Sequence, residues 1–173
     1  IAGSVVSFTG MKEASVSGNW LLCLVVMMVG CPASRPSQIG VTTGRLAPCP
    51  DSPNCVSSQS EDKRHAIEPL RYEGAAGAAM QVLIDVIQGM KRACIKTAQE
   101  RYIHAEFTSF LFRFVDDVEF LLDEGSKTIH VRSASRIGYS DLGVNRKRVE
   151  AIRTRFDALR RKERIIPGSD RSP

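Results

Sequence analysis

The sequence predicts an α+β fold, in which one antiparallel sheet carries helices packed on one face. Three observations lead to this fold class. Apolar residues recur at helical spacing between Gly77 and Met90, apolar and polar residues alternate as in strands within residues 93–133, and a second helical stripe follows Asn145. The order helix, strands, helix is typical of a single two-layer domain.

The first helix is expected over residues 77–90, because its apolar positions fall on one face, as in a helix packed against a sheet. These positions are Met80, Leu83, Ile84, Ile87 and Met90. Residues 93–98 and 102–109 then alternate like strands around a tight turn at Gln99-Glu100. Residues 110–115 continue this apolar, extended pattern, so we expect strand there as well.

A β-hairpin between residues 118–123 and 128–133 is the clearest expected element. Its register pairs Asp123 with Thr128, Leu122 with Ile129, Leu121 with His130, Phe120 with Val131, and Glu119 with Arg132. This pairing collects apolar side chains on one face, whereas a slip by one residue would mix the two faces. The hydrophobic pattern therefore selects the register.

The final helix carries an apolar stripe formed by Val149, Ile152, Phe156 and Leu159, and Asn145 is its expected N-cap. Residues 146–164 contain nine basic and three acidic residues, so the net charge of +5 belongs to this helix. Such a cluster can be a solvated helix face, a contact with anionic lipid head groups or a nucleic-acid interface. We expect no nucleic acid as a partner, because the chain carries an export signal.

That signal is the apolar stretch WLLCLVVMMVGC, residues 20–31, which looks like the export signal of a bacterial lipoprotein. Its ten consecutive apolar residues are too few for a bilayer span, which needs about 20. Met11-Lys12 supplies a start and a basic residue, and Met28-Val29-Gly30-Cys31 resembles the cleavage and lipidation motif. We expect cleavage before a lipidated Cys31; a short buried helix and a plain membrane-anchoring helix are the alternatives.

The expected domain organisation follows from this signal. Residues 1–30 are the signal peptide with its true start at Met11, and residues 31–43 are a lipidated tether rich in Pro, Ser and Thr. Residues 44–162 form the α+β domain, and residues 163–173 are a disordered tail. The chain is therefore expected in the cell envelope, lipid-anchored to a membrane and facing the periplasm, with an anionic lipid or an envelope protein as its possible partner.

The cysteines are interpreted in the light of export. Cys49 and Cys55 flank the turn-forming sequence PDSPN and should form a disulfide outside the cytoplasm. A metal site using both of them with His65 is the alternative, but it lacks an obvious fourth ligand. We expect no metal and no other cofactor. Cys94 lies in an apolar stretch and is expected to be a small buried residue.

The best candidate binding site is the loop between Arg132 and Arg146, which leaves a strand and enters a helix N-terminus, where backbone N–H groups favour anions. Its candidate anion-binding residues are Arg132, Ser133, Ser135, Arg136, Asn145 and Arg146. The alternative is that these arginines pair internally with Asp116, Asp117, Glu119 and Asp141 while the serines cap the helix.

Catalytic residues are not evident in the sequence, and we assign none. Asp116-Asp117 could be an acid–base pair, but consecutive strand residues point to opposite faces, so ion pairing is the simpler role. His104 and His130 lie on expected strands, and a catalytic role would need a serine or aspartate brought close by folding. The chain contains no nucleophile elbow, no zinc-protease motif and no phosphate-binding glycine loop.

Three segments carry a family resemblance: PCPDSPNCVSSQ (48–59), YIHAEFTSFLFRFVDDVEF (102–120) and IHVRSASRIGYSDLGVNRKRVEAIR (129–153). They closely resemble a bacterial and plant family named Domain of Unknown Function 1499, over about residues 44–160. The resemblance implies a family without an established activity, whose bacterial members often carry lipoprotein signals or membrane segments. We therefore expect a non-catalytic binding or structural module, with an envelope enzyme or binder of an anionic small molecule as the alternative.

Overall fold

The structure is a computed structural model that describes residues 39–111 and 113–165. These residues belong to one compact unit. The expected signal peptide, Cys31 and the end of the chain from residue 166 lie outside the described residues. Neither helix within them is long and apolar enough to cross a bilayer.

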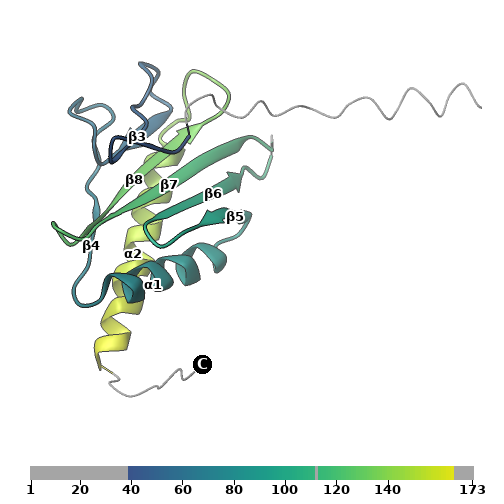
Figure 1. Ribbon diagram of the computed structural model, residues 1–173. Helices are drawn as coiled ribbons and strands as arrows, with labels where there is room; N and C mark the ends of the chain where they lie inside the picture. The colour runs from purple at the N-terminus through teal and green to yellow at the C-terminus, as the bar shows by residue number, and fades with distance from the viewer. Residues whose placement is uncertain (1–38, 112, 166–173) are drawn as a thin grey trace, which may run out of the picture. The chain divides into compact units, whose positions relative to one another are not determined.

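A six-stranded antiparallel sheet forms one layer, and two helices cover one of its faces (Figure 1). The predicted α+β class is therefore confirmed. The strands are β3 (Cys55–Ser57), β4 (Leu70–Arg71), β5 (Ala93–Ala98), β6 (Tyr102–Thr108), β7 (Val115–Asp123) and β8 (Thr128–Ser135). The sheet order is β3-β8-β7-β6-β5, and β4 also pairs with β8.

The helices are α1 (Ala76–Gln88) and α2 (Val144–Ile165), and they pack against each other as well as against the sheet. A separate two-stranded hairpin, formed by β1 (Val41–Thr42) and β2 (Arg45–Leu46), lies against the opposite face through β7. This hairpin begins within the residues expected to form the tether. Helix α2 continues to Ile165, past the expected domain boundary at residue 162.

The predicted register of the β7–β8 hairpin is confirmed at all five proposed pairs. Because side chains alternate along each strand, Val118, Phe120 and Leu122 point toward the helices and join the main hydrophobic core. Phe120 on β7 and Phe156 on α2 are among the largest fully buried side chains and belong to the same hydrophobic core. Truncating either ring to alanine would cost about 3–5 kcal/mol of stability.

The expectation of strand over residues 110–115 is wrong, because β6 ends at Thr108 and β7 begins at Val115. Two hydrogen bonds close a loop between them, from Ser109 N to Phe114 O and from Phe114 N to Ser109 Oγ, both 2.8 Å. Arg113 adopts φ 52°, which no extended strand allows. The apolar side chains of this segment mark a loop tip rather than a buried strand.

Two single-residue expectations are also wrong. Cys94 is exposed, because β5 is an edge strand and Cys94 faces away from the helices. Asn145 is not the N-cap, because α2 begins at Val144 and the carboxylate of Asp141 accepts the first free amides, from Gly143 at 2.9 Å and Asn145 at 2.7 Å. Asn145 is instead fully buried inside the domain.

Candidate functional site: a charged layer on the outer sheet face

The sheet face opposite the helices, called the outer face below, carries ionisable side chains instead of a hydrophobic core. They alternate with the core residues of β5, β6, β7 and β8, so the same two-residue period builds both faces. We call this set the charged layer. It consists of Lys96, His104, Glu106, Asp117, Glu119, Arg132 and Arg136, with Tyr102 at its edge.

Glu119 is the centre of one half of the layer and is completely buried. Its carboxylate accepts hydrogen bonds from Gly40 N at 2.6 Å, Tyr102 Oη at 2.8 Å and Arg132 Nη1 at 3.1 Å. These donors come from three separate parts of the chain, so Glu119 ties the segment before β1 to β6 and β8. Arg132 Nε is buried and has no hydrogen-bond partner within the described residues.

Asp117 is the centre of the other half and is also completely buried. Arg136 holds it with two bonds, at 2.8 and 2.7 Å, and His104 Nε2 lies 2.8 Å from the same carboxylate. Arg136 also pairs with Glu106, which in turn pairs with Lys96 at 3.0 Å. The network thus runs without interruption from β5 to the end of β8.

Pairing decides the ionisation of this layer. Burial alone would raise the pKa of Asp117, but Arg136 and His104 outweigh burial and lower that pKa. The same balance lowers the pKa of Glu106, where Arg136 and Lys96 supply the positive charge. Burial and the bond to Glu119 raise the pKa of the Tyr102 hydroxyl, so it stays a neutral donor. Asp117 and Glu106 are therefore ionised in their ion pairs at neutral pH.

Folding brings an acid to each strand histidine. His104 meets Asp117, but Arg136 already occupies both carboxylate oxygens, so the contact orients the histidine inside the layer. Asp116, on the opposite face as expected for consecutive strand residues, pairs with Arg148 of α2 at 2.5 Å. Ion pairing is thus the observed arrangement of both aspartates.

His130 lies between a serine and an aspartate, the set of groups found in a nucleophilic triad. Ser58 Oγ is 3.3 Å from His130 Nδ1, and Asp123 Oδ2 is 4.0 Å from His130 Nε2. However, Ser58 Oγ also accepts the Val131 amide at 2.9 Å, a contact that gives the hydroxyl a structural role. Burial lowers the pKa of His130, so its ring is neutral at pH 7. In this geometry, the bonds of Ser58 to His130 and Val131 hold the chain after β3 against β8.

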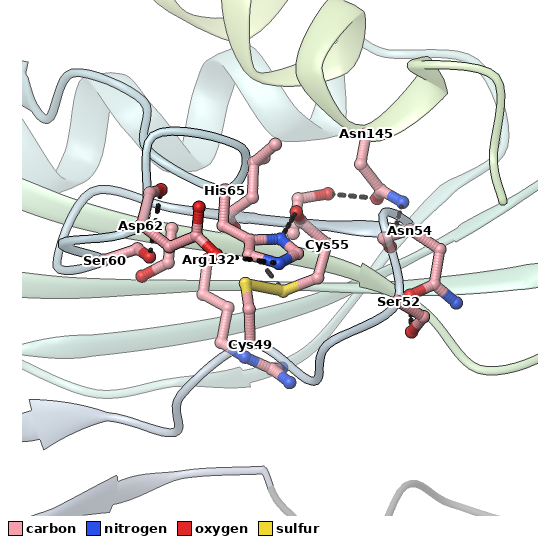
Figure 2. Close-up of a disulfide and its surroundings, with 12 residues drawn as sticks. Cys49, Ser52, Asn54, Cys55, Ser60, Asp62, His65, Arg132 and Asn145 are labelled. Carbon is pink, nitrogen blue, oxygen red and sulfur yellow. Dashed lines mark hydrogen bonds and ion pairs between the residues drawn. A yellow bond between two sulfur atoms is a disulfide. The ribbon is translucent and has the colours of Figure 1, made fainter. Parts of the chain in front are cut away.

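The predicted disulfide between Cys49 and Cys55 is present, with a Cα–Cα distance of 5.7 Å (Figure 2). His65 lies beside it, and its Nδ1 is 2.9 Å from Cys55 O. Because both sulfurs are bonded to each other, they offer no thiolate to the alternative metal site. No group of three His, Cys, Asp or Glu residues within 39–111 and 113–165 is placed to hold a metal ion.

The residues of the predicted anion site are divided between the two sheet faces. Arg132 and Arg136 lie in the charged layer, whereas Ser133, Ser135 and Asn145 lie on the helix face. Asn145 bonds to Ser133 Oγ at 2.5 Å and to Ser135 Oγ at 2.9 Å. It also donates to Asn54 O at 2.9 Å, and both residues are labelled in Figure 2. Arg146 donates to Arg64 O at 3.2 Å. An anion site made by all six residues stays a prediction.

Sequence reasoning missed the β6 side of the layer and its link to β5. The signal was present as a polar set at every second position, Tyr102, His104 and Glu106, between the core residues of the same strand. Lys96 pairs with Glu106 across the β5–β6 hairpin, and that hairpin's register was not worked out from the sequence. Arg148 carried no comparable signal, because its partner Asp116 is far away in the sequence.

The β1–β2 hairpin borders two open cavities on the outer face, each of about 830 Å³, a size that accepts small ligands or peptide side chains. One lies toward the disulfide, beside Cys49 and His65. The other, called the hairpin groove below, is lined by Val41, Tyr102 and His130 among others. The groove therefore adjoins the charged layer at Tyr102.

These features define a small two-layer α+β module with an ion-paired outer face and a disulfide-bonded loop. The chain belongs to the family described as Protein of unknown function (DUF1499), whose sequence model matches residues 45–156. The resemblance seen in the sequence is thereby confirmed. No curated protein and no solved structure matches the chain.

Proposed function

We propose that this chain is an exported, lipid-anchored module of the bacterial cell envelope that acts by binding rather than by catalysis. The part of this proposal that concerns location is supported by the Cys49–Cys55 disulfide, since disulfides persist in oxidising compartments and are rare in the cytosol. It agrees with the export signal and with Cys31 at the end of it.

The ion-paired charged layer is the observation that carries the binding role. Each of its carboxylates has a basic partner within the fold, and Asp117 and Glu119 are completely buried. General acid–base catalysis requires a titratable group within reach of a substrate and with a pKa near the working pH. The lowered pKa values of Asp117 and Glu106 keep both groups ionised instead. The charged layer thus acts as a rigid support for a binding surface instead of as a catalytic centre.

The hairpin groove is the surface on which we place the partner. Its floor includes Tyr102 and His130, while Val41 on the hairpin is exposed at its edge. The bond from Gly40 N to Glu119 fixes the hairpin to the charged layer, so the groove is preformed. Preformed sites bind with a smaller loss of conformational entropy.

The anchor is tested by labelling cells with a tagged fatty acid. We expect label on the natural chain and none on Cys31→Ala, because the thiol is the only acceptor in the proposed reaction. A Cys23→Ala variant is the matched control and should be labelled like the natural chain. Absence of label from the natural chain, or equal label on Cys31→Ala, contradicts the anchor.

The groove is tested by a photocrosslinking amino acid placed in intact cells at Val41 or at Leu159. These positions are 41% and 38% exposed, so they are equally accessible, but Leu159 lies on α2 away from the groove. We expect one discrete crosslinked species from position 41 that is absent from position 159. Identical patterns, or no product at position 41, contradict binding in the groove.

A further inference from the structure

Three loops leave the same end of the sheet and lie next to one another (Figure 1). The loop before β5 is joined to the end of β6 by Thr108 N to Arg92 O, 3.1 Å, and the loop after β8 is joined to the start of β7 by Arg136 N to Val115 O, 3.2 Å. We call residues 89–92, 109–114 and 136–144 the tip loops; residue 112 within them is outside the described part of the chain.

The tip loops expose an unusual amount of apolar surface. Seven of the nine exposed large hydrophobic residues of the described chain belong to them. The most exposed are Leu142 at 87%, Phe110 at 81%, Tyr139 at 76% and Leu111 at 73%. Single exposed apolar residues are ordinary on protein surfaces, but a cluster of them indicates an interaction site.

The backbone displays one of these side chains at a conformational cost. Leu142 has φ 53°, a left-handed conformation that is unfavourable for leucine by about 1 kcal/mol. Asp141 holds this turn by accepting the amides of Gly143 and Asn145. The fold thus fixes Leu142 in an outward position instead of turning it into the core.

The charges of the tip loops identify the kind of partner. Their exposed charged residues, Lys91, Arg92 and Arg113, are all basic, while Asp141 is half-buried and engaged by backbone amides. The Arg92 guanidinium lies 5.5 Å from the centre of the Phe110 ring, so a cation and an apolar ring form one unit. Apolar and aromatic side chains beside basic ones are typical of surfaces that enter the interface of an anionic bilayer.

We infer that the tip loops dock on a bilayer containing anionic phospholipid, with Phe110, Leu111 and Leu142 entering the acyl–headgroup boundary. The length of the tether supports this occupant. Because Gly40 is already bonded to Glu119, only residues 32–39 separate it from Cys31, and they can span at most about 29 Å. This part of the argument rests on the proposed anchor; the apolar and basic character of the loops does not.

The test uses the protein purified from membranes and carrying Trp20→Phe, so that no natural tryptophan remains whether or not residues 1–30 are cleaved. A new tryptophan is placed at Phe110 or, as control, at Leu159. Each protein is reconstituted in vesicles of brominated phosphatidylcholine with or without phosphatidylglycerol. We expect bromine quenching and a blue-shifted emission for Phe110→Trp, both stronger with phosphatidylglycerol, and neither for Leu159→Trp.

The basic residues give a quantitative expectation. Adding Arg113→Gln to Phe110→Trp should lower the ratio of docked to undocked chains by about fivefold, the factor that corresponds to about 1 kcal/mol for one basic residue near an anionic surface. A second reporter, Leu142→Trp, should behave like Phe110→Trp and guards against a local effect of the first substitution. Circular dichroism of each variant shows that the fold is kept.

Equal quenching at positions 110 and 159, or none at position 110 or 142, overturns the inference. A blue shift at position 110 without bromine quenching also overturns it, because the loops would then be covered by protein, such as a second copy. The two proposals can fail separately. Quenching at position 110 with no fatty-acid label on the natural chain supports the docking surface and rejects the anchor. Label on the natural chain without quenching at position 110 does the reverse.

Discussion

Replacing Glu119 with glutamine tests whether the charged layer is a closed network. The substitution keeps the shape of the side chain, and its carbonyl oxygen can still accept from Gly40 N and Tyr102 Oη. It removes the negative charge opposite Arg132, whose side chain is only 5% exposed. A buried guanidinium without a counter-charge has lost both its hydration and its partner.

The expected loss of unfolding free energy is about 3 kcal/mol, the lower end of the range measured when one member of a buried ion pair is removed. Arg132→Met should cost a similar amount, because it leaves the carboxylate unpaired. The double variant Glu119→Gln/Arg132→Met should lie within about 1.5 kcal/mol of the natural protein, since both charges are gone. The loss of unfolding free energy in the double variant should therefore be much smaller than the sum of the two single losses.

The assay is urea unfolding followed by circular dichroism at pH 7 with the disulfide intact. Glu124→Gln is the matched control, because Glu124 lies exposed in the β7–β8 turn and should change stability by less than about 0.5 kcal/mol. The reasoning is refuted if Glu119→Gln costs less than about 1 kcal/mol. It is also refuted if the two single losses simply add in the double variant, which would show that water reaches Arg132.

Three further predictions concern the elements that hold the outer face and α2 in place. Replacing Cys49 and Cys55 together by serine should lower the urea-unfolding free energy by about 2 kcal/mol, because the closed loop is short. Asn145→Ala should cost about 2–3 kcal/mol in the same assay, because it leaves buried partners unsatisfied. Since the folded pKa values of Glu106 and Asp117 are lowered, the unfolded chain binds more protons in acid, and urea midpoints should hold above about pH 5 and fall as the pH drops below about 4.

Each of these has a result that contradicts it. An unfolding free energy of the serine variant equal to that of the natural protein with its disulfide intact would show that the loop is held by other contacts. The natural protein under reducing conditions is the control and should behave like the serine variant. If Asn145→Ala changes the unfolding free energy as little as a substitution at an exposed position, water must replace the amide group. A midpoint that rises on acidification would show that the carboxylates are destabilising in the folded state.

The hairpin and the fold class could be predicted because their signals are local and periodic. In β7 and β8 only one register collects the apolar residues on one face, so sequence alone identified the Glu119–Arg132 pair. The helices were predicted for the same reason, from apolar stripes at helical spacing. The disulfide was predicted from two cysteines around a turn in a chain expected to be exported.

The remaining features depend on contacts that sequence spacing does not specify. Asn145 is a good N-cap residue, but its position is set by Ser133 and Ser135 on β8, which draw the amide inward. The apolar run after Thr108 has strand composition, yet it forms an exposed loop. Apolar residues that serve a binding surface are exposed, although their composition predicts burial. The wrongly predicted strand over residues 110–115 therefore coincides with the proposed docking surface.

The central claim, that the chain is exported, processed and anchored by a lipid, is tested most directly by the intact mass of the protein purified from its natural membrane. The account predicts a polypeptide that starts at Cys31, carries the mass of an acylated diacylglycerol modification, and lacks the two hydrogens removed by the Cys49–Cys55 bond. A mass that includes residues before Cys31, or that shows both thiols reduced, contradicts it.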